Sequence, residues 1–202
     1  FCKSYGPPEN LVLEEVKDLK PGNGEALVEV YAAALNFPDT LQIAGKYQYQ
    51  PPFPFIPGSE AGGIIRKLGP NVKGFDTGDR VMANPGIGAM AEQVCVPFGR
   101  LRKIPDSMSF KTASGFPMVY TTSYYALKQK AELQPGETML VLGASGGVGI
   151  AAVELGKLIG ANVIAAASSE EKLEFAKKAG ADYLVNYSDG ELKTKIKELT
   201  NG

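Results

Sequence analysis

A glycine-rich turn is the part of this sequence best suited to chemistry. An apolar run ends at Leu142, and Gly143-Ala144-Ser145-Gly146-Gly147-Val148-Gly149 then leads into a helical stretch. In such a turn, Gly146 lets the backbone approach a pyrophosphate, and Gly149 lets the helix pack closely on the strand. The helix N-terminus adds amide donors and the positive end of its dipole. Ala144 replaces the first glycine of Gly-x-Gly-x-x-Gly, and an ordinary tight turn is the alternative, but the flanking strands favour a dinucleotide site.

The end of the next apolar run bears on which dinucleotide binds. Folds that bind NAD usually place Asp or Glu there, about 20 residues beyond the turn, to hold the ribose hydroxyls. Here Asn162–Ala167 runs directly into Ser168, and the acid is missing. Ser168 and Lys172 could bind a 2′-phosphate instead, which favours NADPH. Alternatively, Ser168 and Glu171 form a capping box, Lys172 is a solvated helix residue, and Glu170 or Glu171 serves the ribose.

The composition excludes the common zinc sites. The chain has no histidine and only two cysteines, Cys2 and Cys95, whereas His and Cys supply most zinc ligands. Basic and acidic residues nearly balance, 21 against 22, so no broad surface attracts nucleic acid or anionic membrane. No apolar run approaches the roughly 20 residues needed to span a bilayer. We expect a cytoplasmic protein, with the mitochondrial matrix as the alternative.

Two kinds of element must position these residues. Thirteen of the fourteen prolines lie before residue 120, where short apolar or alternating runs are typical of a β barrel or sandwich. The strands expected there are Glu25–Val30, Gly62–Leu68, Arg80–Ala83 and Glu92–Val96. The last third alternates strand and helix, which indicates a parallel sheet with right-handed crossovers. Its expected elements are strands Thr138–Leu142, Asn162–Ala167 and Tyr183–Asn186, and helices Val148–Ile159, Glu170–Ala179 and Gly190–Leu199. We place the domains at residues 1–122 and 123–202.

The sequence resembles the zinc-independent quinone oxidoreductases of the medium-chain dehydrogenase/reductase superfamily, the group that includes zeta-crystallin. The resemblance runs through the whole chain, and its carriers are Asn36–Thr40, Gly45–Tyr47, Phe55–Gly63, Gly78–Val81, Thr121–Leu127 and Gly143–Gly149. Zinc-dependent relatives carry Cys where this chain has Asn36 and His where it has Ser59, so no zinc is expected. The resemblance implies a GroES-like β domain that carries substrate groups, followed by a Rossmann domain that binds NADPH, with the active site between them.

The resemblance also implies roles for individual residues. Tyr47 would lie beside the nicotinamide and the substrate carbonyl, and Asn36 and Asp39 would shape the same wall as catalytic residues. The residues implied to bind NADPH are Tyr47, Thr122, Ser145, Gly146, Gly147, Val148, Ser168, Lys172 and Tyr187. Each has a plainer alternative: Asn36 and Asp39 could cap their segment, Tyr47 could pack among neighbouring aromatic residues, and Tyr187 could pack against the sheet edge.

The implied activity is zinc-independent hydride transfer from NADPH to a quinone or an α,β-unsaturated carbonyl. An enoyl-thioester reductase and a non-catalytic NADPH-binding structural or regulatory protein are the alternatives. The chain supplies only the first half of a dinucleotide-binding sheet. We therefore expect an incomplete Rossmann domain from a longer protein, with weak cofactor binding and little turnover by itself. The expected partners are a small-molecule quinone or enone and a second copy in a homodimer, with no metal, membrane or nucleic acid.

Overall fold

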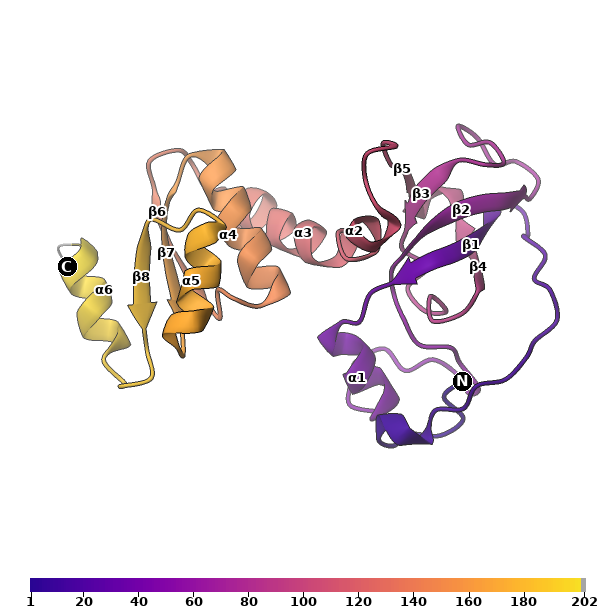
Figure 1. Ribbon diagram of the computed structural model, residues 1–202, viewed down its shortest axis with the longest axis horizontal. Coiled ribbons are helices and arrows are strands. Elements are labelled where there is room, and N and C mark those ends of the chain that lie inside the picture. Colours follow the sequence, from indigo (N-terminus) through magenta and orange to yellow (C-terminus); the bar gives the residue numbers. More distant parts are fainter. Residues whose placement is uncertain (201–202) are drawn as a thin grey trace. The chain divides into compact units, whose positions relative to one another are not determined.

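The alternating runs of the first part of the chain form one antiparallel sheet. In this computed structural model, which describes residues 1–200, the strands lie in the order β4-β1-β2-β3-β5 (Figure 1). Their bounds are β1 Glu25–Ala33, β2 Ala61–Leu68, β3 Arg80–Ala83, β4 Gln93–Pro97 and β5 Leu101–Lys103. The helical segments are η1 Pro8–Asn10, α1 Phe37–Ile43, η2 Phe98–Arg100 and α2 Phe110–Ser114. These elements belong to one unit, Phe1–Met118, and a second unit begins at Val119.

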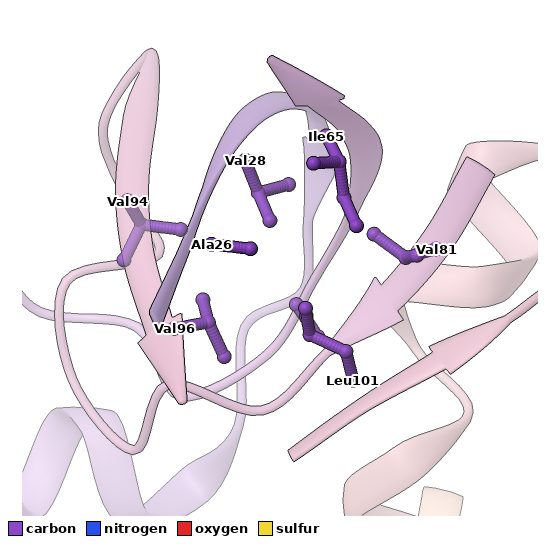
Figure 2. Packing of buried hydrophobic residues seen from close by; sticks show 8 residues of the cluster. Ala26, Val28, Ile65, Val81, Val94, Val96 and Leu101 are labelled. Carbon is purple, nitrogen blue, oxygen red and sulfur yellow. The ribbon is translucent and has the colours of Figure 1, made fainter. Parts of the chain in front are cut away.

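Side-chain alternation along the strands builds the core of the first unit. The register pairs Val28 of β1 with Ile65 of β2 on one side and with Val94 of β4 on the other. Figure 2 shows these side chains pointing to a common centre. The buried cluster comprises Ala26, Val28, Ile65, Val81, Ala83, Val94, Val96 and Leu101. Burial of each of its Val, Ile and Leu side chains contributes about 1.5–3 kcal/mol, which fixes the register of the strands that carry the site loops.

The segment between β1 and β2 carries α1, and a small separate cluster anchors that helix. Ile43 at its end packs with Cys2 and Phe55. Cys2 and Phe55 also exchange two backbone hydrogen bonds of 2.8 and 3.1 Å. Gly45 follows with φ 68°, and a Cβ at that position would lie 2.7 Å from the Tyr5 ring. The first residues of the chain therefore hold α1 in place.

The second unit is a parallel three-stranded sheet with helices on both faces (Figure 1). Its elements are β6 Thr138–Leu142, α4 Gly147–Ile159, β7 Asn162–Ala167, α5 Glu170–Lys178, β8 Tyr183–Asn186 and α6 Leu192–Thr200. The central strand β7 serves two cores. Val163 and Ala165 pack in the cluster of α4 and α5, whereas Ile164 and Ala166 pack in the cluster that includes Ile196 of α6. A strand buried on both faces reads as a continuous apolar run, as this one does.

The predicted fold class is confirmed. All seven strands expected from the sequence are present, and the last third alternates strand and helix as predicted. The short strand β5 and the helices α1, α2, α3 (Pro117–Tyr124) and η3 (Tyr125–Lys130) were not predicted. The expected domain boundary at residue 122 and the division after Met118 both fall inside α3, so the boundary within that helix stays a prediction. None of the helices within residues 1–200 has the length and apolar character required to cross a bilayer.

Candidate functional site

The glycine-rich turn is fixed to the end of the parallel sheet by backbone hydrogen bonds. β6 ends at Leu142, and Gly143 adopts a left-handed conformation with φ 62°. The Gly146 N–H donates to the Gly143 carbonyl at 3.0 Å, and the Ala144 N–H donates to Ala166 of β7 at 3.1 Å. The position of the turn therefore depends on the backbone of two strands.

Two glycines of the turn differ in the space around them. A Cβ on Gly149 would lie 2.4 Å from the Gly143 carbonyl oxygen and 2.8 Å from the Ala144 Cα. Helix α4 therefore contacts the strand end backbone to backbone, and packing requires a glycine there. A Cβ on Gly146 would meet nothing closer than 3.5 Å. Because packing does not require Gly146, its missing side chain leaves room for a ligand.

The N-terminus of α4 has the character of an anion site. Its N-cap, Gly146, is extended and supplies no side-chain hydrogen bond. The first hydrogen bond of the helix runs from the Ile150 N–H to the Gly146 carbonyl, at 2.8 Å. The N–H groups of the residues before Ile150 have no partner within the helix. Gly146, Gly147 and Val148 are exposed and Ser145 is half-buried. These donors and the helix dipole fit the pyrophosphate contacts predicted for Ser145–Val148.

Ser168 and Lys172 meet at the end of β7. The Lys172 Nζ donates to the Ser168 hydroxyl at 3.0 Å. The structure corrects the alternative capping assignment: the N-cap of α5 is Ser169, whose hydroxyl accepts the Lys172 N–H at 3.4 Å. Ser168 therefore does not cap the helix. A hydroxyl and an ammonium side by side at this position suit a phosphate.

The other residues near this end of the sheet have partners of their own. The Asn186 side-chain amide donates to the Glu170 carboxylate at 2.8 Å. Tyr187 packs against the β7–β8 cluster, as the plainer alternative predicted, and its N–H donates to Ala167, the residue before Ser168, at 3.1 Å. Thr122 is exposed on α3, and no hydrogen bond within residues 1–200 ties it to the turn.

Asn36 and Asp39 form the start of α1. Asn36 is the N-cap, and its backbone N–H donates to the Asp39 carboxylate at 2.8 Å. The capping alternative is therefore confirmed for this pair. Asp39 is only 1% exposed, and burial raises the pKa of its carboxyl while the bond from Asn36 opposes the rise. A cap made by a buried carboxyl is unusual, since caps commonly lie at the surface.

Glu60 is a candidate that the sequence did not reveal. It is 1% exposed, and its Oε1 accepts the Asn36 Nδ2 at 2.8 Å while its Oε2 accepts the Met118 N–H at 2.7 Å. Burial raises the pKa of its carboxyl, the two hydrogen bonds oppose this, and the charge of Asp39 raises it further. One sequence signal could have pointed to Glu60: it is the one acid in the run of small residues Gly58–Gly63, which leads into an apolar strand. A charge buried at such a position needs hydrogen-bond partners.

Hydrogen bonds join Asn36 to Asp39 and to Glu60, whereas none of those in the described residues joins Tyr47 to this group. Tyr47 is half-buried in the loop after α1, and no hydrogen bond within residues 1–200 links it to Asn36 or Asp39. The Asp39 Oδ1 and the Ser59 Oγ are buried and lack a hydrogen-bond partner within the described chain. In the same residues, no three His, Cys, Asp or Glu side chains are grouped to hold a metal ion.

Known proteins match both units. Residues 22–106 match the alcohol dehydrogenase GroES-like domain, and residues 147–202 match the zinc-binding dehydrogenase family. The chain is 41% identical to a quinone oxidoreductase-like protein 2 homolog of Nematostella vectensis, over 100% of this chain and 55% of that protein. The chain thus spans about half the length of the curated relatives it matches.

The solved structures that this chain resembles include quinone oxidoreductases. Quinone oxidoreductase from Pseudomonas syringae superposes with a TM-score of 0.93 at 35% identity, covering 99% of this chain and 62% of that one. The Escherichia coli quinone oxidoreductase, crystallised with NADPH, also gives 0.93, at 34% identity over 99% and 61% of the two chains. With a GroES-like sheet, a dinucleotide turn at the end of β6 and relatives across its full length, this chain belongs to the quinone oxidoreductase group of the medium-chain dehydrogenase/reductase superfamily.

Proposed function

We propose that this chain carries the substrate groups and the adenosine side of the NADPH site of a zinc-independent reductase for quinones or α,β-unsaturated carbonyls. The observation that carries the proposal is the open space at Gly146, beside a helix N-terminus with no side-chain cap. The names of the relatives, and the NADPH in the Escherichia coli structure, support the same function.

The second unit would bind the cofactor through two anionic groups. The N–H groups of Ser145, Gly147 and Val148, with the open space at Gly146, would bind the pyrophosphate, and Lys172 with Ser168 would bind the 2′-phosphate. Tyr187 would flank the adenosine, since its backbone is bonded to the end of β7. Thr122, exposed on α3, would lie near the nicotinamide amide. The Asn186 amide holds the Glu170 carboxylate by a hydrogen bond of 2.8 Å.

The first unit would hold the acceptor. Bound NADPH supplies a hydride, and the protein's part is to position the acceptor, exclude water and stabilise developing oxyanion charge. Asn36, Asp39 and Tyr47 are the residues proposed to line this site. A quinone or enone spreads that charge by conjugation, so hydrogen bonds can replace the metal that polarises a simple carbonyl in zinc enzymes. The absence of histidine agrees with this chemistry.

Calorimetric titration with NADPH and with NADH tests the cofactor assignment. Lys172→Ala should weaken NADPH binding about 10-fold and leave NADH binding unchanged, because only NADPH carries the 2′-phosphate. Lys177→Ala, an exposed lysine in the last turn of the same helix, is the matched control and should change neither affinity. Equal losses for both cofactors in Lys172→Ala would contradict the phosphate pocket.

Turnover by the intact protein tests the reaction. With NADPH, a 1,4-quinone and a simple enone should both be reduced, and dialysis against a chelator should leave the rate unchanged. Reduction of an enoyl thioester alone would favour an enoyl-thioester reductase. Tight NADPH binding without turnover of any acceptor would favour a non-catalytic, NADPH-binding role, and loss of activity to the chelator would contradict zinc independence.

A further inference from the structure

Glu60 uses both of its carboxylate oxygens to hold two segments that lie far apart in the sequence. The Asn36 amide donates to one oxygen and the Met118 backbone N–H donates to the other. Met118 lies at the start of α3, where helix N–H groups have no partner within the helix. Because the carboxylate is held from two sides and is 1% exposed, it has little freedom to turn.

A carboxylate in this place determines which way the Asn36 amide faces. An asparagine side chain has a donor end and an acceptor end, and rotation by half a turn exchanges them. An ionised carboxylate only accepts, so one N–H of the amide faces Glu60, and the second N–H remains to donate to an acceptor oxygen. The backbone of Asn36 is fixed as well, because its N–H donates to Asp39. The position and the polarity of the amide are therefore both determined.

We propose that Glu60 is a positioning residue for the reductase: it orients the Asn36 amide toward the acceptor and touches neither acceptor nor cofactor itself. This rests on the proposed function, in which Asn36 lines the acceptor site. The two N–H donors that face this carboxylate favour its ionised form, because each binds one of its oxygens. Asp39 is the other titratable group that acts on Glu60, and its charge opposes that ionisation.

Glu60→Gln is the sharpest perturbation, because it keeps the size of the side chain and replaces one acceptor oxygen by a donor. Either Asn36 or the Met118 N–H then faces another donor. Ser114→Ala is a matched control: Ser114 is 3% exposed in the same unit, and its hydroxyl bonds to the Lys111 carbonyl rather than to Asn36. In the intact protein, Glu60→Gln should lower kcat roughly 10- to 100-fold with the KM for NADPH unchanged, and Ser114→Ala should not.

A double-mutant cycle with Asn36→Ala decides whether Glu60 acts through Asn36. If it does, Glu60→Gln should cost nothing further once the amide is gone. If the fold-losses in kcat of the two single variants multiply in the double variant, the two residues act independently and the proposal is overturned. The side-chain amide resonances of Asn36 give a readout that needs no turnover: Glu60→Gln should shift them, and Ser114→Ala should not. Unshifted resonances would overturn the proposal, whereas shifted resonances in a protein that reduces no acceptor would refute the proposed function alone.

Discussion

Replacing Gly149 or Gly146 with alanine should separate the effect of the dinucleotide turn on stability from its effect on NADPH binding. At Gly149 a Cβ would lie 2.4 Å from the Gly143 oxygen, while ordinary contact begins at 3.4 Å, so backbone must move by about 1 Å. Overpacking of this kind costs roughly 3 kcal/mol. The higher helix propensity of alanine offsets about 1 kcal/mol of this loss of stability. The net loss of about 2 kcal/mol should lower the Tm of the second unit by roughly 8–16 °C.

Gly146→Ala should show the opposite pattern. The nearest atom to its Cβ is 3.5 Å away and its φ of −76° suits any residue, so stability should change by no more than about 0.5 kcal/mol. The methyl group would occupy the space left for a pyrophosphate, and NADPH affinity should fall at least about 10-fold, or about 1.4 kcal/mol. Thermal unfolding by circular dichroism without ligand, and calorimetric titration well below the Tm, measure the two effects. An unchanged Tm in Gly149→Ala, or unchanged NADPH affinity in Gly146→Ala, would refute the reasoning.

Two further predictions concern polar pairs in the second unit. The Asp182 carboxylate accepts from Lys157 Nζ at 2.6 and 2.7 Å and from the Val163 N–H at 2.7 Å. Both partners lower the pKa of this carboxyl, and the bond from Lys157 has the larger effect. The pair should therefore stabilise the fold fully above about pH 4 and progressively less as the pH falls further, so Asp182→Asn should cost about 1 kcal/mol at pH 7 and less near pH 3 in denaturant titrations. A hydrogen bond to Glu154, with burial, raises the pKa of Tyr120 to about 12. In an NMR titration of the tyrosine Cζ signals, the one lost in Tyr120→Phe should be unshifted at pH 10, and a midpoint near 10 would contradict the structure.

The parallel sheet could be predicted because its signals are local. β7 is one apolar run, and Gly146 and Gly149 lie in the turn that follows β6, so period and spacing suffice. Helix caps were less well determined. Ser168 and Ser169 both suit an N-cap, and the choice of Ser169 depends on where the backbone turns. The first helix, α1, was missed because it is short and its cap, Asn36, serves equally well in a turn.

The Asn36–Glu60 pair could not be predicted because its partners are distant. Glu60 meets Asn36 across 24 positions and Met118 across 58 positions. Nothing in the sequence near Glu60 indicates that two donors will converge on it. The register of β1 and β2, set by apolar pairs such as Val28 and Ile65, brings Asn36 close to Glu60. The types of the site residues were readable in the sequence, whereas their partners depended on the tertiary fold.

The different constraints on Gly149 and Gly146 change what the glycine signature can tell about a protein. Gly149 is required by contact between a helix and a strand end, whether or not a nucleotide is ever bound. A descendant that lost its enzymatic role would keep that glycine for as long as it kept its fold. Gly146 is under no such constraint, so drift at this position would mark a protein released from selection for cofactor binding. In surveys that sort active reductases from inactive descendants, Gly146 is therefore the position to compare.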